Sequence, residues 1–136
     1  MSFLVDTNVV SELRKGERCD PNVRRWYGSL ADDDVFLSVL SVGELRRGIE
    51  LIRRRDERSA ESLDAWLSQI VSVHADRLLP VDSDVAEMWG RMGVPDPLPV
   101  VDGLLAATAM VHGLTLATRN VKDIERTGAS FVNPFA

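Results

Sequence analysis

Four acidic side chains lie at positions from which they could act together on a phosphate ester. They are Asp6, Glu44, Asp102 and Asp123. Each lies just after an apolar run or at the start of a predicted helix. A cluster of carboxylates is electrostatically costly unless a cation offsets it. Hard carboxylate oxygens suit Mg²⁺ or Mn²⁺, and one or two such ions can activate water and stabilise an in-line displacement at phosphorus.

The segments that would position these acids alternate between strand and helix patterns. Apolar runs predict strands at residues 3–5, 35–40, 78–81 and 114–118, with a last edge strand at 131–132. Helical spacing, caps and stops predict helices at residues 8–14, 21–30, 41–55, 57–73, 83–92, 101–112 and 119–126.

This alternation predicts the class of fold. Strands separated by helices favour a mainly parallel central sheet covered on both faces, which makes a three-layer α/β/α sandwich. Ligands of such folds bind outside the carboxyl ends of the strands, where these acids are expected. The length of 136 residues predicts a single domain over residues 1–136.

Each acid also has a purely structural interpretation. Asp6 could cap the first helix, and Glu44 could be the capping-box partner of Ser41. Asp102 could pair with a helix dipole, and Asp123 could be an ordinary exposed loop acid. The metal-site interpretation therefore depends on the set of four and on no single position.

Four strings around these acids resemble the ordered motifs of one nuclease family. They are residues 4–9 (LVDTNV), 41–48 (SVGELRRG), 101–109 (VDGLLAATA) and 118–123 (TRNVKD). They are similar to motifs of PIN-domain nucleases, and in particular to VapC-type toxins of type II toxin–antitoxin modules, FitB-like branch. The likeness spans almost the whole chain, with the motifs in the right order.

The resemblance implies a PIN-like sandwich and a divalent-metal-dependent endoribonuclease that uses Mg²⁺ (or Mn²⁺). By position, the family's three characteristic acids match Asp6, Glu44 and Asp102, and its more variable fourth acid matches Asp123. The family's supporting polar positions near the site match Thr7, Thr118 and Asn120.

The same resemblance implies the partners. They are an RNA substrate, a small cognate antitoxin whose C-terminal segment occupies the active-site groove with a blocking basic side chain, and a second copy in a homodimer. The helices around Trp66 and Trp89 are the apolar candidates for the dimer face.

The charge balance bears on the substrate and the location. The chain has 16 Lys and Arg against 21 Asp and Glu, a net charge of −5, which by itself argues against a nucleic-acid binder. The arginines, however, are concentrated in and after the Glu44 segment, where Arg46 and Arg47 are candidate RNA contacts. The structural alternative is a set of ion pairs with the interleaved acids Glu50, Asp56, Glu57 and Glu61.

A single cysteine, Cys19, excludes an intrachain disulfide and is typical of a protein of the reducing cytoplasm. No apolar run is long enough for a transmembrane span, so no membrane association is expected. We expect a cytoplasmic protein.

Three other functions remain open. A haloacid-dehalogenase-like phosphatase would need a second Asp at position 8, which is Asn8. A receiver-like signalling module would need a late lysine that Lys122 matches poorly. The third is a PIN-like RNA-processing or RNA-binding protein that is not a toxin.

Overall fold

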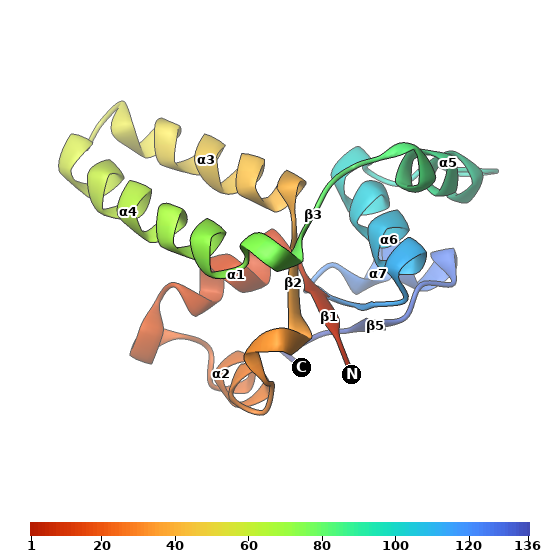
Figure 1. Ribbon diagram of the computed structural model, residues 1–136, viewed down its shortest axis with the longest axis horizontal. Coiled ribbons are helices and arrows are strands. Elements are labelled where there is room, and N and C mark those ends of the chain that lie inside the picture. The colour runs from red at the N-terminus through yellow and green to blue at the C-terminus, as the bar shows by residue number, and fades with distance from the viewer.

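A five-stranded sheet forms the centre of the computed structural model, which describes residues 1–136 (Figure 1). The strands are β1 (Phe3–Val5), β2 (Val35–Ser38), β3 (Leu78–Leu79), β4 (Thr115–Ala117) and β5 (Phe131–Val132). Their order is β3-β2-β1-β4-β5, and all four pairings are parallel. The predicted parallel sheet is therefore confirmed.

Seven α-helices surround this sheet. They are α1 (Thr7–Leu13), α2 (Pro21–Gly28), α3 (Val39–Arg53), α4 (Glu57–Val73), α5 (Ser83–Met92), α6 (Val100–His112) and α7 (Val121–Ile124). Figure 1 shows α3 and α4 side by side in a hairpin that extends away from the strands, whereas α5 and α6 lie on the other side of the sheet. No helix is long and apolar enough to cross a membrane.

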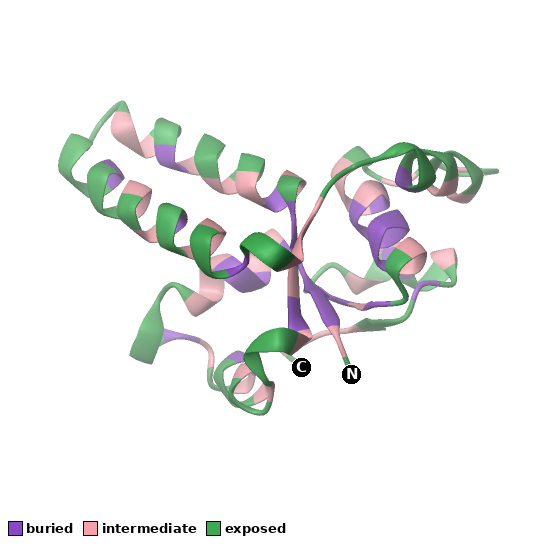
Figure 2. Ribbon diagram, viewed as in Figure 1, coloured by how far each residue is buried: buried purple, intermediate pink, exposed green.

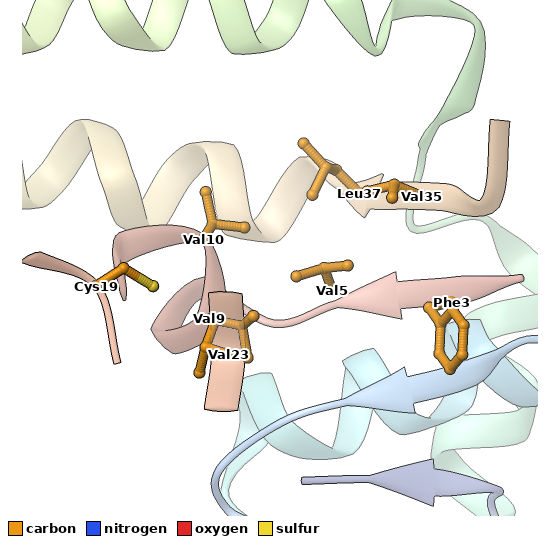
Figure 3. Packing of buried hydrophobic residues seen from close by; sticks show 8 residues of the cluster. All are labelled: Phe3, Val5, Val9, Val10, Cys19, Val23, Val35 and Leu37. Atoms are coloured by element: carbon orange, nitrogen blue, oxygen red, sulfur yellow. The ribbon is translucent and has the colours of Figure 1, made fainter. Parts of the chain in front are cut away.

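Alternate residues of β1 contribute to opposite faces of the sheet. Phe3 and Val5 pack in one cluster with α1 and α2, as Figure 3 shows. Leu4 packs in a second cluster with Leu105 of α6 and Leu116 of β4. All three residues of β1 are buried, as Figure 2 shows for the strands at the centre. The predicted three-layer sandwich is thus confirmed.

The start of α3 differs from the prediction. Ser38 is the N-cap, and its hydroxyl accepts a 3.0 Å hydrogen bond from the N–H of Leu40. The strand therefore ends two residues earlier than predicted, and Ser41 lies inside the helix, buried, with no hydrogen-bond partner for its hydroxyl. The capping-box interpretation of Ser41 and Glu44 is wrong, and Glu44 lies in the second turn of α3 instead of the first.

The other element boundaries agree with the sequence pattern to within two residues. Asp20 caps α2 with Pro21 in its first turn, and α4 spans the predicted residues. Helix α6 ends at Gly113, whose φ of 66° is the left-handed conformation that glycine adopts without strain. Helix α6 begins at Val100, directly after the Pro-rich loop, and Asp102 therefore lies in its first turn, as predicted.

Candidate active site

Asp6 lies at the junction of β1 and α1. Its N–H donates to the carbonyl of Ala117 at 2.9 Å, which extends the β1–β4 ladder by one residue. Its own carbonyl accepts from the N–H groups of Val9 and Val10, so it is also the N-cap of α1. The structural alternative for Asp6, helix capping, is therefore present. It does not account for the side-chain contacts that follow.

Three donors hold the Asp6 carboxylate. Oδ2 accepts from the hydroxyl of Thr118 at 2.7 Å and from the side-chain amide of Asn8 at 3.3 Å. Oδ1 accepts from the N–H of Thr7 at 2.6 Å. Because Asp6 and Thr118 are both buried, this carboxylate has one fixed orientation at the carboxyl ends of β1 and β4.

Thr7 joins the first two acids. Its N–H binds Asp6, and its hydroxyl donates to Oε1 of Glu44 at 2.6 Å. Glu44 comes from α3, so this one threonine connects the end of β1 to the helix that follows β2. The two carboxylates are thereby brought to the same edge of the sheet, although 37 residues separate Thr7 from Glu44.

Thr118 organises the opposite side of the site. Its hydroxyl donates to Asp6 and accepts from the N–H of Asn120 at 3.0 Å. Asn120 is exposed at the N-terminal end of α7, and its side chain makes no capping hydrogen bond. Thr118 and Asn120, two of the three predicted supporting residues, therefore lie beside the acids.

Asp102 and Asp123 face a common pocket. They line a cavity of about 380 Å³ together with Asn120 and Lys122. Asp102 is partly buried, and no donor of the chain binds its carboxylate. Its charge is therefore not compensated by the protein itself.

Burial and mutual repulsion act on two of these acids. Desolvation is the larger cause that raises the pKa of Asp102, followed by the negative charges of Asp6, Asp123 and Glu44. Burial also raises the pKa of Asp6, although its hydrogen bonds to Thr118 and Thr7 oppose that shift. The four acids therefore share one electrostatic environment in which a cation would be stabilised.

The acids do not form a ready-made metal cage. No three His, Cys, Asp or Glu side chains lie close enough together to bind one ion directly. The donor set is nevertheless made of hard oxygen atoms, among them the unpartnered carboxylate of Asp102. Mg²⁺ is commonly held by one or two carboxylates and keeps several waters, so these residues fit such an ion.

The two candidate RNA-binding arginines differ in their contacts. Arg46 is ion-paired with Glu50, at 3.2 Å, and with Asp64 of α4. The structural alternative of helix ion pairs therefore holds for Arg46. Arg47 is exposed and forms no ion pair, so an RNA contact there stays a prediction.

A mostly apolar cavity adjoins the hollow beside Glu44. Its volume is about 510 Å³, and it is bordered by α1, α2, α4 and the sheet. Cys19, Tyr27 and Ile70 are among its lining residues. Arg14 lines both this cavity and a smaller one that contains Thr7 and Glu44, so the two hollows adjoin.

Comparison with known proteins identifies the family. Residues 3–129 match the model of the PIN domain. The chain belongs to the PIN-domain family. This PIN domain is 34% identical to Toxin FitB of Neisseria gonorrhoeae over 98% of both chains. It is 30% identical to VapC ribonuclease Y4jK of Sinorhizobium fredii over 98% of this chain and 97% of that protein.

Solved structures agree with this assignment. The crystal structure of FitAcB from Neisseria gonorrhoeae superposes with a TM-score of 0.89 at 33% identity over 98% of both chains. The VapC20 toxin of Mycobacterium tuberculosis, described as cleaving the sarcin–ricin loop, superposes with a TM-score of 0.67 at 22% identity and shows the shared fold alone. Membership of the family excludes the phosphatase-like and receiver-like alternatives.

Sequence reasoning missed three residues of this PIN domain that border the site. Asn8 binds Asp6 through its amide and accepts from the N–H of Arg119 at 3.3 Å. The guanidinium of Arg119 lies over the ring of Phe135. The position of Asn8, two residues after Asp6, is a sequence feature that could have predicted its contact with that acid. No feature of the sequence predicted the contact between Arg119 and Phe135.

Proposed function

We propose that this PIN domain is a divalent-metal-dependent endoribonuclease that acts as the toxin of a toxin–antitoxin pair. The observation that carries the proposal is the Thr7–Glu44 and Thr118–Asp6 pair of hydrogen bonds, which fixes two acids from distant segments whose charges both act on Asp102. Several relatives are named ribonucleases or toxins, among them VapC ribonuclease Y4jK and Toxin FitB. Cellular RNA in the cytoplasm is the proposed substrate.

In the proposed mechanism, each acid has a distinct part. Asp6 is fixed by Thr118 and Thr7, so it offers a carboxylate oxygen in a constant direction. Glu44 is oriented by the Thr7 hydroxyl. Asp102 contributes a carboxylate that accepts no hydrogen bond from the chain. Asp123 lines the same pocket as Asp102 and completes the acidic wall on that side.

We assign Asp6, Glu44 and Asp102 as the residues that would hold Mg²⁺ or Mn²⁺, directly or through waters, with Asp123 at a second position. A bound ion would supply a Lewis acid and lower the pKa of a water nucleophile. The low exposure of Asp6 and Thr118 excludes bulk water from one side of the site. Electrostatic interactions are stronger in such a partly dry site.

The proposed partner is a small antitoxin protein. Solved relatives include FitAB bound to a DNA fragment and VapBC from Haemophilus influenzae. In this chain, the apolar cavity of 510 Å³ meets the hollow beside Glu44 at Arg14. An extended segment with apolar side chains followed by a basic residue fits this sequence of surfaces, and the basic residue would offset the carboxylates.

A homodimer is the proposed assembly of the toxin. Trp89 of α5 is 40% exposed, whereas Trp66 is partly buried against two core clusters. The surface around Trp89 is therefore the better candidate for a contact between copies.

The experiment combines cleavage and rescue. Purified protein is incubated with cellular RNA in Mg²⁺, in Mn²⁺ or in EDTA, and the new RNA ends are mapped. We expect cleavage only with a divalent ion, leaving 5′-phosphate and 3′-hydroxyl ends. Asp102→Asn should abolish it, and the neighbouring gene product should relieve the growth arrest.

The possible outcomes separate the two functions. Cleavage without growth arrest favours an RNA-processing enzyme that is not a toxin. RNA binding without cleavage favours an RNA-binding protein. Cleavage at the wild-type rate by Asp102→Asn contradicts the site assignment.

A further inference from the structure

Two arginines of the α3–α4 hairpin are engaged in ion pairs. Arg46 and Arg53 share the acids Glu50 and Asp64, so their charges are offset within the α3–α4 hairpin. Arg119 and Lys122 are exposed, line the Asp102 pocket and form no ion pair, and of these two only Arg119 lies over an aromatic ring. The charge of Arg119 is therefore available to a ligand.

The backbone of Arg119 is fixed close to Asp6. Its N–H donates to Oδ1 of Asn8 at 3.3 Å, and the amide of Asn8 donates to Asp6 at 3.3 Å. Arg119 also follows Thr118 directly, whose hydroxyl binds the same carboxylate. Arg119 is thus two hydrogen bonds away from an acid of the site.

The side chain of Arg119 rests on an aromatic ring. Its guanidinium carbon lies 3.9 Å from the centroid of Phe135, well within the range of a cation–π contact. Stacking occupies a face of the planar guanidinium, whereas its N–H donors point outward around the edge. The ring therefore restricts the side chain without using its hydrogen bonds.

Phe135 itself is anchored, although it is the penultimate residue. Its N–H donates to Oδ1 of Asn133 at 3.0 Å, and its carbonyl accepts from the side chain of Asn22 at 3.0 Å. Its ring packs against the cluster of Phe3 and Val23. The C-terminal residues therefore form a rigid platform for Arg119.

We infer that Arg119 binds a backbone phosphate of the RNA next to the cleaved bond, and that Phe135 is a positioning residue that holds Arg119 there. This inference rests on the proposed function. Four carboxylates repel a phosphodiester chain, so a cation beside them is needed to attract it. A guanidinium binds phosphate through two parallel N–H donors, and pre-ordering by the ring reduces the entropy lost on binding.

The test measures RNA binding without catalysis. A short single-stranded RNA with a fluorophore is titrated with the full-length protein in EDTA over a range of salt concentrations. For Arg119→Gln we expect roughly tenfold weaker binding at low salt. We also expect the slope of log K against log salt to decrease by about 0.7, the value for one phosphate contact on a single strand.

Other variants separate charge from position. Arg119→Lys keeps the charge, so the salt slope should stay as in the wild type while affinity falls a few-fold. Phe135→Leu retains an apolar side chain at the anchor and should likewise weaken binding with an unchanged slope. Arg58→Gln is the matched control, since Arg58 is exposed, unpaired and at the start of α4, at the far end of the hairpin (Figure 1).

Two results would overturn the inference. One is a folded Arg119→Gln protein with wild-type RNA affinity and salt slope. Arg119 would then have only a structural role, its contact with the ring of Phe135. The other is an equal loss of RNA affinity for Arg58→Gln, which would mean that any positive charge contributes equally, whatever its position on the surface. If the wild-type protein neither binds nor cuts RNA, the proposed function fails and this inference with it. Cleavage by the wild type together with an inert Arg119→Gln change would remove this inference alone.

Discussion

The hydroxyl of Thr7 donates a 2.6 Å hydrogen bond to Oε1 of Glu44, while the N–H of the same residue binds Asp6. One threonine therefore sets the relative position of two acids that come from different elements. Mutation of a group that orients a metal ligand typically lowers metal affinity or activity by about 10- to 100-fold. The predictions below begin with this contact.

Thr7→Val should remove the hydroxyl without changing the size of the side chain. We expect RNA cleavage to fall about 10- to 100-fold, because Glu44 loses the donor that orients it. Thr7→Ser retains the hydroxyl and is the matched control, with activity close to that of the wild type. Single-turnover cleavage at saturating Mg²⁺ measures the effect. A Thr7→Val protein as active as Thr7→Ser would show that the contact has no part in catalysis.

Asp102→Asn should separate activity from stability. We expect cleavage to fall at least about 100-fold. Because desolvation and the neighbouring acids raise the pKa of Asp102, ionisation of this group destabilises the folded, metal-free protein. The contribution of protonated Asp102 to folding stability is fully present below its ordinary pKa of 3.8, and it is lost as pH rises through the raised pKa.

The stability arm of this prediction is thermal unfolding in EDTA at neutral pH. Asp102→Asn should melt at a higher temperature than the wild type, and added Mg²⁺ should raise the melting temperature of the wild type more than that of the variant. Asp96→Asn, which changes an exposed acid of the Pro-rich loop, is the control. A lower melting temperature for Asp102→Asn would contradict the electrostatic argument.

Ser38 and Ser41 offer a matched pair at the start of α3. Ser38→Ala removes the N-cap hydrogen bond to Leu40 and should lower the free energy of unfolding by about 1 kcal/mol. Ser41→Ala removes a buried hydroxyl that has no partner, so its effect should be neutral or stabilising. Equilibrium unfolding in urea measures both changes. A larger loss in the free energy of unfolding for Ser41→Ala than for Ser38→Ala would indicate that Ser41 is the N-cap.

Asp64 links the two helices of the hairpin, because it accepts from both Arg46 and Arg53. Hydrogen bonds from Arg53 first, then from Arg46, lower the pKa of Asp64. Its stabilising contribution is therefore present above the ordinary value of 3.8 and is lost as pH falls through the lowered value. Asp64→Asn should have a lower melting temperature than the wild type at neutral pH. The difference in melting temperature should be smaller in high salt and smaller in acid.

Glu61→Gln is the control for this change, since Glu61 is exposed and unpaired on the same helix. An equal destabilisation by both changes, or a loss for Asp64→Asn that persists unchanged in high salt, would count against the ion-pair network.

Gly28 provides a way to fill the apolar cavity beside the site. It borders that cavity, and no atom lies within 4 Å of the position that a Cβ would take. Gly28→Phe should leave RNA cleavage unchanged and prevent the antitoxin from relieving growth arrest. Gly90→Phe changes another helical glycine with open space around it and should leave rescue intact. Rescue of Gly28→Phe at the wild-type level would place the antitoxin elsewhere.

Local sequence patterns predicted most of the elements of this PIN domain. Helix α4 has the predicted bounds because its caps and apolar spacing agree. The start of α3 was predicted too late because residues 39 and 40 are apolar and continue the strand pattern, whereas the hydroxyl of Ser38 decides the boundary. The extent of the domain, residues 1–136, stays a prediction.

Long-range contacts of the site left little trace in the sequence. The bond between Thr118 and Asp6 joins residues 112 positions apart, and only the likeness to PIN-domain motifs pointed to Thr118. The pairing of Arg46 with Asp64 depends on how α3 and α4 pack, which the spacing within either helix does not reveal. The same holds for the contact of Arg119 with Phe135.

The central place of β1 governs when the site can exist during synthesis. This strand pairs with β4, and the carboxylate of Asp6 is held by Thr118, which comes 112 positions later in the sequence. Asp6 therefore lacks this hydrogen bond until Thr118 has left the ribosome. A fragment released before Thr118 is made lacks the assembled site, so the proposed RNA cleavage requires translation to have passed that residue.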